Sequence, residues 1–242
     1  MKALILAAGL GSRLKNSTKD IPKALVEVNG KPIIEYQIEA LSSCGIEDII
    51  VVIGKFGSKI INYFKKNYPQ KNVTYVTNSI YDKSNSSYSF WLARNYLNDG
   101  EYIHLNCDII FSKKLLMSII KNQSSNIIAV RTDIEFTDQM ENVIFDSYGR
   151  ITSMGKSIYE SSKGKAFGLA KLSLESTLAI TRKIQNYLNN NDKNQHCYGM
   201  IRELVNDLEY HAFNSDKHLL IEVNTEDDLQ LANIILKKSF VK

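Results

Sequence analysis

The sequence predicts an α/β protein with a mostly parallel sheet and helices on both faces, followed by a β-hairpin and helical region. Over the first 132 residues, short apolar runs alternate with segments of helical periodicity, the pattern of repeated β-α-β units. Most of these runs are apolar throughout, as expected for strands buried on both faces. After Glu135 the alternation gives way to a hairpin pattern and further helical segments.

The predicted strands are apolar runs bounded by glycine, proline or polar residues. In chain order they cover residues 3–8, 49–53, 73–76, 102–106, 127–130, 140–145, 151–154, 165–172, 210–213 and 219–223. The predicted helices have apolar residues three or four positions apart. They follow Pro32 and end before Gly45, surround Ile60 and Phe64, run from 88 to 96, surround Leu115 and Ile119, cover 174–188 and 198–208, and begin at Thr225. We expect one compact domain whose later part covers the carboxyl edge of the sheet.

Charge and composition exclude several classes of protein. The chain has 30 Lys and Arg against 26 Asp and Glu, mixed along its length, so no basic cluster for nucleic acid is expected. No apolar run approaches membrane-spanning length, and the run at 3–8 is too short for a signal peptide. Three scattered cysteines without a CxxC pair, Cys44, Cys107 and Cys197, indicate reduced thiols and a cytoplasmic location.

The strongest local feature follows the first predicted strand. It reads Leu6-Ala7-Ala8-Gly9-Leu10-Gly11-Ser12-Arg13-Leu14, and Pro22-Lys23-Ala24-Leu25 comes shortly after. Glycines after a buried strand let the backbone approach a ligand and direct N–H groups at phosphate oxygens. Arg13 and Lys23 add cations that suit a phosphate. A dinucleotide fingerprint would require glycine at position 14, where Leu14 stands.

These motifs, with Asn29-Gly30-Lys31-Pro32, resemble the nucleoside-triphosphate transferase family of sugar-phosphate nucleotidyltransferases and their phosphocholine, phosphonate and inositol phosphate relatives. The resemblance implies a Rossmann-like fold and transfer of a nucleoside monophosphate from an NTP, with release of pyrophosphate. The nucleotide-binding residues expected on this basis are Leu6, Ala7, Ala8, Gly9, Gly11, Ser12, Arg13, Lys23, Tyr81, Asn85, Ser86 and Asn106. Without repeats or a linker in the sequence, we expect a single domain, 1–242, with a nucleotide-binding half (1–132) and an acceptor-side half (133–242).

The segment from Tyr81 to Ser89 lies just before a predicted helix. Its small polar residues are typical of helix caps and turns. The segment also resembles a stretch of the cytidylyltransferase branch that lies against the base, with Ser86 where a second asparagine is usual. This resemblance favours CTP as the nucleotide.

Asp108 follows a buried strand, at the end where open parallel sheets bind ligands. It resembles the family's metal-binding aspartate in Leu-Asn-Gly-Asp, with Cys107 in place of the glycine. A late segment with Glu222 and Asn224 resembles the stretch that completes the metal site, with Asn224 where aspartate is usual. The resemblance implies Mg²⁺ bound by Asp108, Glu222 and Asn224. The alternative for Asn224 is that it caps the following helix.

Lys156 resembles a family lysine that reaches the acceptor phosphate, so Arg13, Lys23 and Lys156 are the expected catalytic residues. The favoured acceptor is a small phosphorylated or phosphonate molecule, similar to phosphocholine, an aminoalkylphosphonate or a phosphorylated amide. Tyr159 and Tyr198 are candidate aromatic faces for a quaternary ammonium.

A sugar-1-phosphate or inositol phosphate is the second choice of acceptor, and a non-catalytic nucleotide-binding regulatory protein is the alternative of another class. The expected partners are an NTP and the acceptor, without nucleic acid or membrane, in a pathway that makes cell-surface precursors. The oligomeric state, monomer or homodimer, is left open.

Overall fold

A computed structural model describes residues 1–239, apart from the side chains of Lys15, Asn16, Tyr159, Lys238 and Ser239. Within these residues nine strands form one sheet. They are β1 (Lys2–Ala7), β4 (Asp48–Ile53), β5 (Asn72–Thr77), β6 (Tyr102–Asn106), β8 (Ile127–Arg131), β9 (Asn142–Phe145), β10 (Ile151–Gly155), β11 (Gly164–Leu172) and β12 (His211–Asn214). Two short pairs lie outside this sheet. They join β2 (Glu27–Val28) to β3 (Lys31–Pro32), and β7 (Ile109–Phe111) to β13 (Leu220–Glu222).

Four central strands run parallel in the order β6, β1, β4 and β5. Leu6 of β1 pairs with Val52 on one side and with Asn106 on the other, so these strands end at nearly the same level. The segment after β1, residues 8–14, is called the glycine loop. This loop and Asp108, which follows β6, therefore leave the sheet at one carboxyl edge. Open α/β sheets bind their ligands at this edge.

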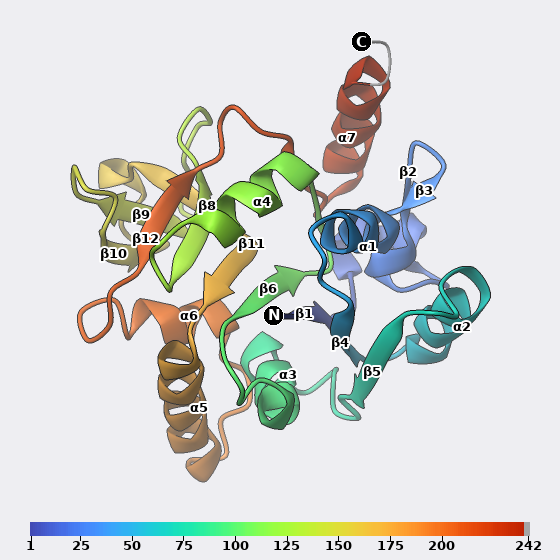
Figure 1. The fold of residues 1–242 in the computed structure, drawn as a ribbon, viewed down its shortest axis with the longest axis horizontal. Coiled ribbons are helices and arrows are strands. Elements are labelled where there is room, and N and C mark those ends of the chain that lie inside the picture. Colours follow the sequence, from blue (N-terminus) through green and yellow to red (C-terminus); the bar gives the residue numbers. More distant parts are fainter. Residues whose placement is uncertain (240–242) are drawn as a thin grey trace.

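Helices cover both faces of the sheet, as predicted. They are α1 (Ile33–Ser43), α2 (Gly57–Asn67), α3 (Ser86–Ala93), α4 (Lys113–Lys121), α5 (Leu174–Asn189), α6 (Cys197–Arg202) and α7 (Glu226–Ser239). Because strand side chains alternate between faces, Ile5 packs in one core cluster with residues of α1, α2 and α4, whereas Leu4 and Leu6 pack with α3, α5 and α6. Figure 1 shows α1 and α4 on one side of the central strands and α3 and α5 on the other.

The later part of the chain returns to the sheet instead of only covering its edge. β11 runs antiparallel to β6, β8 and β9, and β9 forms the predicted hairpin with β10. The expectation that this part covers the carboxyl edge is therefore only partly correct. The helix predicted at 198–208 is also shorter, because α6 ends at Arg202 and turns follow, although Leu204 and Val205 stay buried.

A third apolar cluster brings α7 against the glycine loop. Leu236 and Ala232 of this helix share the cluster with Leu14 and Val28, and the Asn233 side chain accepts a hydrogen bond from Asn29 N at 2.7 Å. Figure 1 shows α7 beside the β2–β3 hairpin. The last helix therefore supports the segment that carries Arg13 and Lys23.

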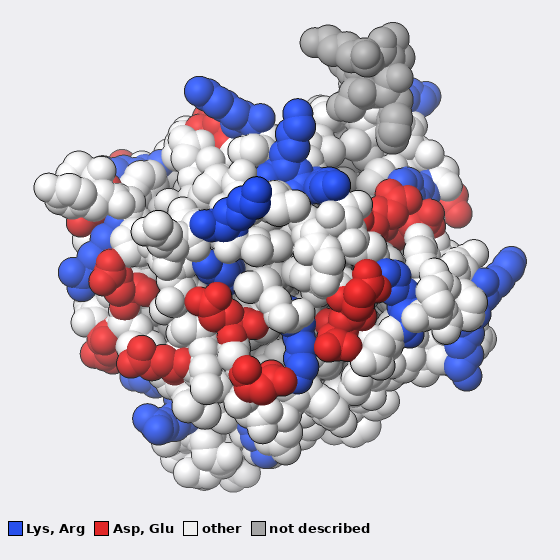
Figure 2. Space-filling model, in the orientation of Figure 1, with Lys and Arg blue, Asp and Glu red and all other residues white. Residues whose placement is uncertain are grey.

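The surface charges are mixed on the face drawn in Figure 2, where acidic and basic side chains lie among one another. None of the helices in the described part of the chain combines the length and the apolar character needed to cross a bilayer.

Candidate active site

A cleft of about 1100 Å³ opens at the carboxyl edge of β1 and β6. Most residues predicted to bind nucleotide, metal or acceptor line it. They are Leu6, Ala8, Gly9, Gly11, Ser12, Arg13, Lys23, Tyr81, Asn85, Ser86, Asn106, Asp108, Lys156, Glu222 and Asn224. Ala7 differs, because its side chain is buried in the core cluster under α1 and does not form part of the cleft wall.

The glycine loop is shaped by contacts that only small residues allow. Gly11 has φ +66°, a left-handed conformation that favours glycine, and its carbonyl accepts a hydrogen bond from the Thr18 hydroxyl at 2.8 Å. At Gly54, just after β4, a Cβ atom would lie 2.5 Å from the carbonyl oxygen of Ala8. The loop can therefore pass close to β4 only because position 54 lacks a side chain.

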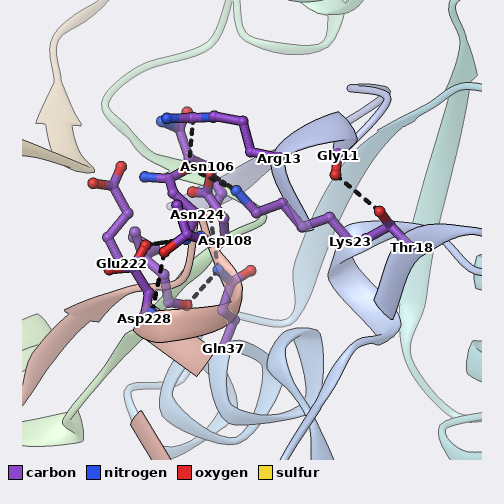
Figure 3. A network of polar contacts seen from close by, with 12 residues as sticks. Gly11, Arg13, Thr18, Lys23, Gln37, Asn106, Asp108, Glu222, Asn224 and Asp228 are labelled. Carbon is purple, nitrogen blue, oxygen red and sulfur yellow. Dashed lines mark hydrogen bonds and ion pairs between the residues drawn. The ribbon is translucent and has the colours of Figure 1, made fainter. Parts of the chain in front are cut away.

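Two cations meet at the loop's inner side, as Figure 3 shows. Lys23 Nζ lies 2.7 Å from Asp108 Oδ2 and 2.8 Å from Asn224 Oδ1, and Arg13 Nη2 donates to the same amide oxygen at 2.7 Å. Asp108 Oδ1 is buried without a partner among the described residues. The cluster thus holds two positive charges and one negative charge beside the glycine loop, which suits a polyanionic ligand.

Asn224 is not the cap of α7. The Thr225 hydroxyl accepts a hydrogen bond from Asp228 N at 3.2 Å, and the Asp228 carboxylate accepts from the backbone N–H groups of Asn224 and Thr225. This reciprocal arrangement is a capping box. It leaves the Asn224 side chain free to face Lys23 and Arg13, so the alternative role as a helix cap is wrong.

Glu222 has a partner that the sequence did not reveal. Lys165 on β11 places Nζ 2.5 Å from Glu222 Oε2, with both side chains mostly buried. Lys165 begins the strand predicted at 165–172, and the apolar pattern of that strand does not mark it as a site residue. The direction of its side chain depends on the placement of β11.

The segment from Tyr81 to Ser89, predicted to lie against the base, caps a helix and also lines the cleft. Asn85 caps α3, since its Oδ1 accepts a hydrogen bond from Ser86 N at 2.8 Å. Its Nδ2 therefore faces His196 Nε2, 3.2 Å away, and the imidazole accepts this bond. The Ser86 hydroxyl also accepts from Cys197 N at 2.9 Å. The start of α6 is thus fastened to the segment predicted to lie against the base.

Several charged residues line the cleft together with His196. Burial lowers the pKa of His196, the cations Lys156, Arg202 and Arg13 lower it further, and Glu141 opposes them. Lys156 is exposed in the cleft wall. Arg202 and Glu141 form an ion pair with an Nη2–Oε2 distance of 2.8 Å. The sequence singled out Lys156 and Arg13 but not Glu141, His196 and Arg202.

Asp108, Glu222 and Asn224 offer the oxygen ligands that Mg²⁺ prefers. The fit is good for Asp108, which has an unpartnered buried oxygen, but the Asn224 oxygen already accepts from two cations. No three His, Cys, Asp or Glu residues in the described part of the chain gather into a metal site. Mg²⁺ commonly takes one or two carboxylates and completes its shell with phosphate and water, which is what these residues permit.

Cys107 stands where the family pattern has glycine, directly before Asp108. Burial raises the pKa of its thiol to about 12, and the neighbouring Asp108 adds to the effect. The side chain therefore stays a neutral thiol and takes no charge into the site.

Residues 3–206 match the MobA-like NTP transferase domain family. The CTP:phosphoglutamine cytidylyltransferase of Campylobacter jejuni is 30% identical over 93% of this chain and 94% of that protein. The choline-phosphate cytidylyltransferase of Streptococcus pneumoniae is 47% identical, but over only 43% of each chain.

A solved structure of CTP:phosphocholine cytidylyltransferase from Streptococcus pneumoniae is similar, with a TM-score of 0.78, 25% identity, and coverage of 97% of this chain and 98% of that one. The resemblance inferred from the motifs is confirmed. The chain belongs to the family of MobA-like NTP transferase domains.

Proposed function

We propose that the protein is a cytidylyltransferase, which transfers CMP from CTP to a small phosphorylated or phosphonate acceptor and releases pyrophosphate. The observation that carries this proposal is the meeting of Arg13, Lys23 and Asp108 in one cleft at the carboxyl edge of the sheet. Three similar proteins, named as choline-phosphate, phosphoglutamine and 2-aminoethylphosphonate cytidylyltransferases, support it.

In the proposed reaction an oxygen of the acceptor's phosphate attacks the α-phosphorus of CTP. The bond from the α-phosphorus to the oxygen that bridges to the β-phosphate breaks, and its electron pair leaves with pyrophosphate. The product carries a new P–O–P link, and no oxidation or reduction occurs. The protein's contribution to such a step is positioning and charge neutralisation.

Arg13 and Lys23 are assigned to the triphosphate and Lys156 to the acceptor phosphate. In the structure Arg13 donates to the neutral amide of Asn224, so its positive charge is not cancelled by that contact. Lys23 shares its ammonium group between Asp108 and Asn224. Both cations can therefore turn toward a phosphate by giving up a hydrogen bond to an amide, at lower cost than leaving a carboxylate.

We propose Mg²⁺ as the metal, bound by Asp108 and Glu222, with Asn224 as a weaker ligand once Arg13 and Lys23 have moved to the nucleotide. When bound there, the ion would neutralise charge that the two phosphate groups bring together. This role requires Glu222 to share its carboxylate with Lys165, whose Nζ lies 2.5 Å away.

The first-choice acceptor resembles phosphocholine, an aminoalkylphosphonate or a phosphorylated amide, and a sugar-1-phosphate or inositol phosphate is the second choice. We propose that residues 1–132 bind the nucleotide and 133–242 the acceptor. A cytoplasmic location and a role in making cell-surface precursors complete the proposal. The cytosol supplies CTP and suits the three free cysteines, Cys44, Cys107 and Cys197.

A panel of four NTPs against several phosphorylated acceptors tests this proposal, with pyrophosphate release as the readout. We expect release with CTP and a phosphorylated or phosphonate acceptor, and much slower release with the other nucleotides. Equal rates with UTP would remove the cytidylyl assignment.

The alternative of another class is a nucleotide-binding regulatory protein, suggested by Asn224 at a position where aspartate is usual. Tight CTP binding without pyrophosphate release from any acceptor would favour it. The pairing of Lys23 with Asp108 favours the enzyme, because it places the residue assigned to the triphosphate beside the residue assigned to the metal.

A further inference from the structure

The carboxylates that line the cleft already have partners within the described residues. Asp108 pairs with Lys23, Glu222 with Lys165, and Asp228 accepts from two backbone N–H groups of the capping box. The fourth, Glu141, pairs with Arg202. A simple cation such as a quaternary ammonium therefore meets no free carboxylate on this part of the wall.

The aromatic faces of the acceptor side are also engaged. Lys165 Nζ lies 4.4 Å from the centroid of the Phe167 ring. The Tyr198 hydroxyl donates to the Phe167 carbonyl at 2.6 Å, and its ring meets His104 edge-on at 6.0 Å between centroids. Phe167 thus already has a cation beside its ring, and Tyr198 is held by a hydrogen bond and a ring contact.

The Glu141–Arg202 pair is different, because three hydrogen bonds hold it and it stands at the cleft. Arg202 Nη2 lies 2.9 and 2.8 Å from the two carboxylate oxygens of Glu141, and Nε lies 3.2 Å from Oε1. Both residues line the cleft, and the Arg202 side chain is 40% exposed. In the described residues Arg202 Nη1 has no hydrogen-bond partner, so one donor edge of the guanidinium is still available.

The backbone around the pair is shaped to hold it. Gly155 has φ +147°, which favours glycine, and a Cβ atom there would lie 3.4 Å from Arg202 Nε. The guanidinium stem therefore lies close against a glycine, one residue before Lys156. The backbone of Glu141 is also held, because its carbonyl accepts a hydrogen bond from Ala166 N at 2.8 Å. This bond ties the residue just before β9 to β11.

We propose that Glu141 and Arg202 bind a zwitterionic head of the acceptor, with the ammonium at Glu141 and the carboxylate at Arg202. The acceptor would then be an α-amino acid that carries its phosphate on a side-chain hydroxyl or on a side-chain amide. This inference rests on the proposed function, because it assigns the acceptor of that same reaction.

Charge balance explains why a zwitterion is preferred to a simple amine. A lone ammonium that takes Glu141 leaves the partly exposed guanidinium of Arg202 without its counter-charge, so the gain at Glu141 is offset by the loss at Arg202. A zwitterion supplies both charges at once, so each residue exchanges one partner for another. The planar guanidinium also matches a carboxylate with two parallel hydrogen bonds.

The position of the pair fits the rest of the proposed site. Arg13 and Lys156 line the same cleft as Glu141 and Arg202. The cations assigned to the phosphates and the pair assigned to the head group thus face one cavity.

Matched acceptors that differ by one carboxylate test the proposal with the full-length protein, CTP and Mg²⁺. The pairs are O-phospho-L-serine with phosphoethanolamine, O-phospho-L-homoserine with 3-aminopropyl phosphate, and phosphorylated glutamine with phosphorylated 4-aminobutanamide. Phosphocholine is included as the quaternary amine. We expect kcat/KM from pyrophosphate release to be at least about tenfold higher for the best amino acid than for its decarboxylated partner, a difference of about 1.4 kcal/mol.

Three variants separate recognition from a structural ion pair. Arg202→Met should raise KM for the amino acid but not for CTP, and should erase the preference within each matched pair. The charge swap Glu141→Arg/Arg202→Glu should keep an ion pair and the fold without restoring that preference. Arg182→Met, on α5 and outside the cleft, serves as the control and should change neither KM.

The outcomes distinguish this inference from the proposed function. Pyrophosphate release that is as fast with the decarboxylated acceptors or phosphocholine would overturn the zwitterion site and leave the cytidylyltransferase intact. A selectivity for amino acids that survives Arg202→Met would also overturn it. CTP binding without release from any acceptor would instead count against the proposed function, and the acceptor assignment would fall with it.

Discussion

Replacing Lys23 by methionine tests whether this lysine both compensates Asp108 and binds the triphosphate. The two side chains are 10% and 16% exposed, and Lys23 Nζ lies 2.7 Å from Asp108 Oδ2. The other carboxylate oxygen has no partner in the described residues, so the variant leaves a mostly buried charge without compensation. Removing one partner of a buried pair costs about 3–5 kcal/mol, and the residual exposure of Asp108 reduces our expectation to about 2–3 kcal/mol. For a chain of this length, that is a fall in Tm of roughly 5–10 °C.

Urea unfolding and initial rates of pyrophosphate release measure the two effects separately. Lys23→Met should lower kcat/KM for CTP by at least ~100-fold, about 2.7 kcal/mol. Adding Asp108→Asn should restore most of the stability without restoring activity, because no uncompensated charge remains. As a control, Lys31→Met breaks an exposed pair with Glu39 and should change the free energy of unfolding by less than about 1 kcal/mol. Unchanged stability, with a loss of kcat/KM below about threefold, would refute the reasoning.

Three further predictions concern the base, the metal and pH. Calorimetric titration with Mg²⁺ present should show tighter binding of CTP than of UTP, GTP or dTTP; equal or better binding of UTP or dTTP would contradict this. Asn224→Asp should lower the Mg²⁺ concentration for half-maximal rate by about three- to tenfold, because it adds a charge and a second ligand oxygen, whereas Glu222→Gln should raise it and nearly abolish turnover. An unchanged titration for Asn224→Asp beside an active Glu222→Gln would exclude the metal site. Burial lowers the pKa of His104 from 6.5 to about 4, so the unfolded chain takes up this proton first as the pH falls. Stability should therefore decline between pH 6.5 and 4, by about 2 kcal/mol at pH 5, and His104→Phe should remove that part of the decline in urea unfolding; equal slopes for both proteins would exclude His104 as its source.

Local sequence signals were sufficient for the elements that build the nucleotide half. Pro32 and Gly45 bracket α1 as predicted, since proline favours a first turn and Gly45 has φ +76° after the last one. One readable signal was missed. Asn29-Gly30, with φ angles of 56° and 75°, is the two-residue hairpin turn between β2 and β3, and this dipeptide is a strong hairpin signal.

The acceptor side was less predictable, because its key contacts join distant parts of the chain. Periodicity located β11 but could not place it between β6 and β8, so the contact of Lys165 with Glu222 was not foreseen. Arg202 meets Glu141 across 61 positions, and its guanidinium lies beside Gly155. Such pairings depend on the tertiary arrangement, and neither residue stands in a motif that marks it.

The fate of the α-phosphate of CTP tests the central claim most directly. The protein would be incubated with Mg²⁺, an accepted acceptor and CTP labelled with ³²P at either the α or the γ position. We predict that the α label appears in a CDP-linked product and the γ label in pyrophosphate, both lost with Lys23→Met. Transfer of the γ label to the acceptor, or an α label that leaves only as free CMP, would contradict cytidylyl transfer.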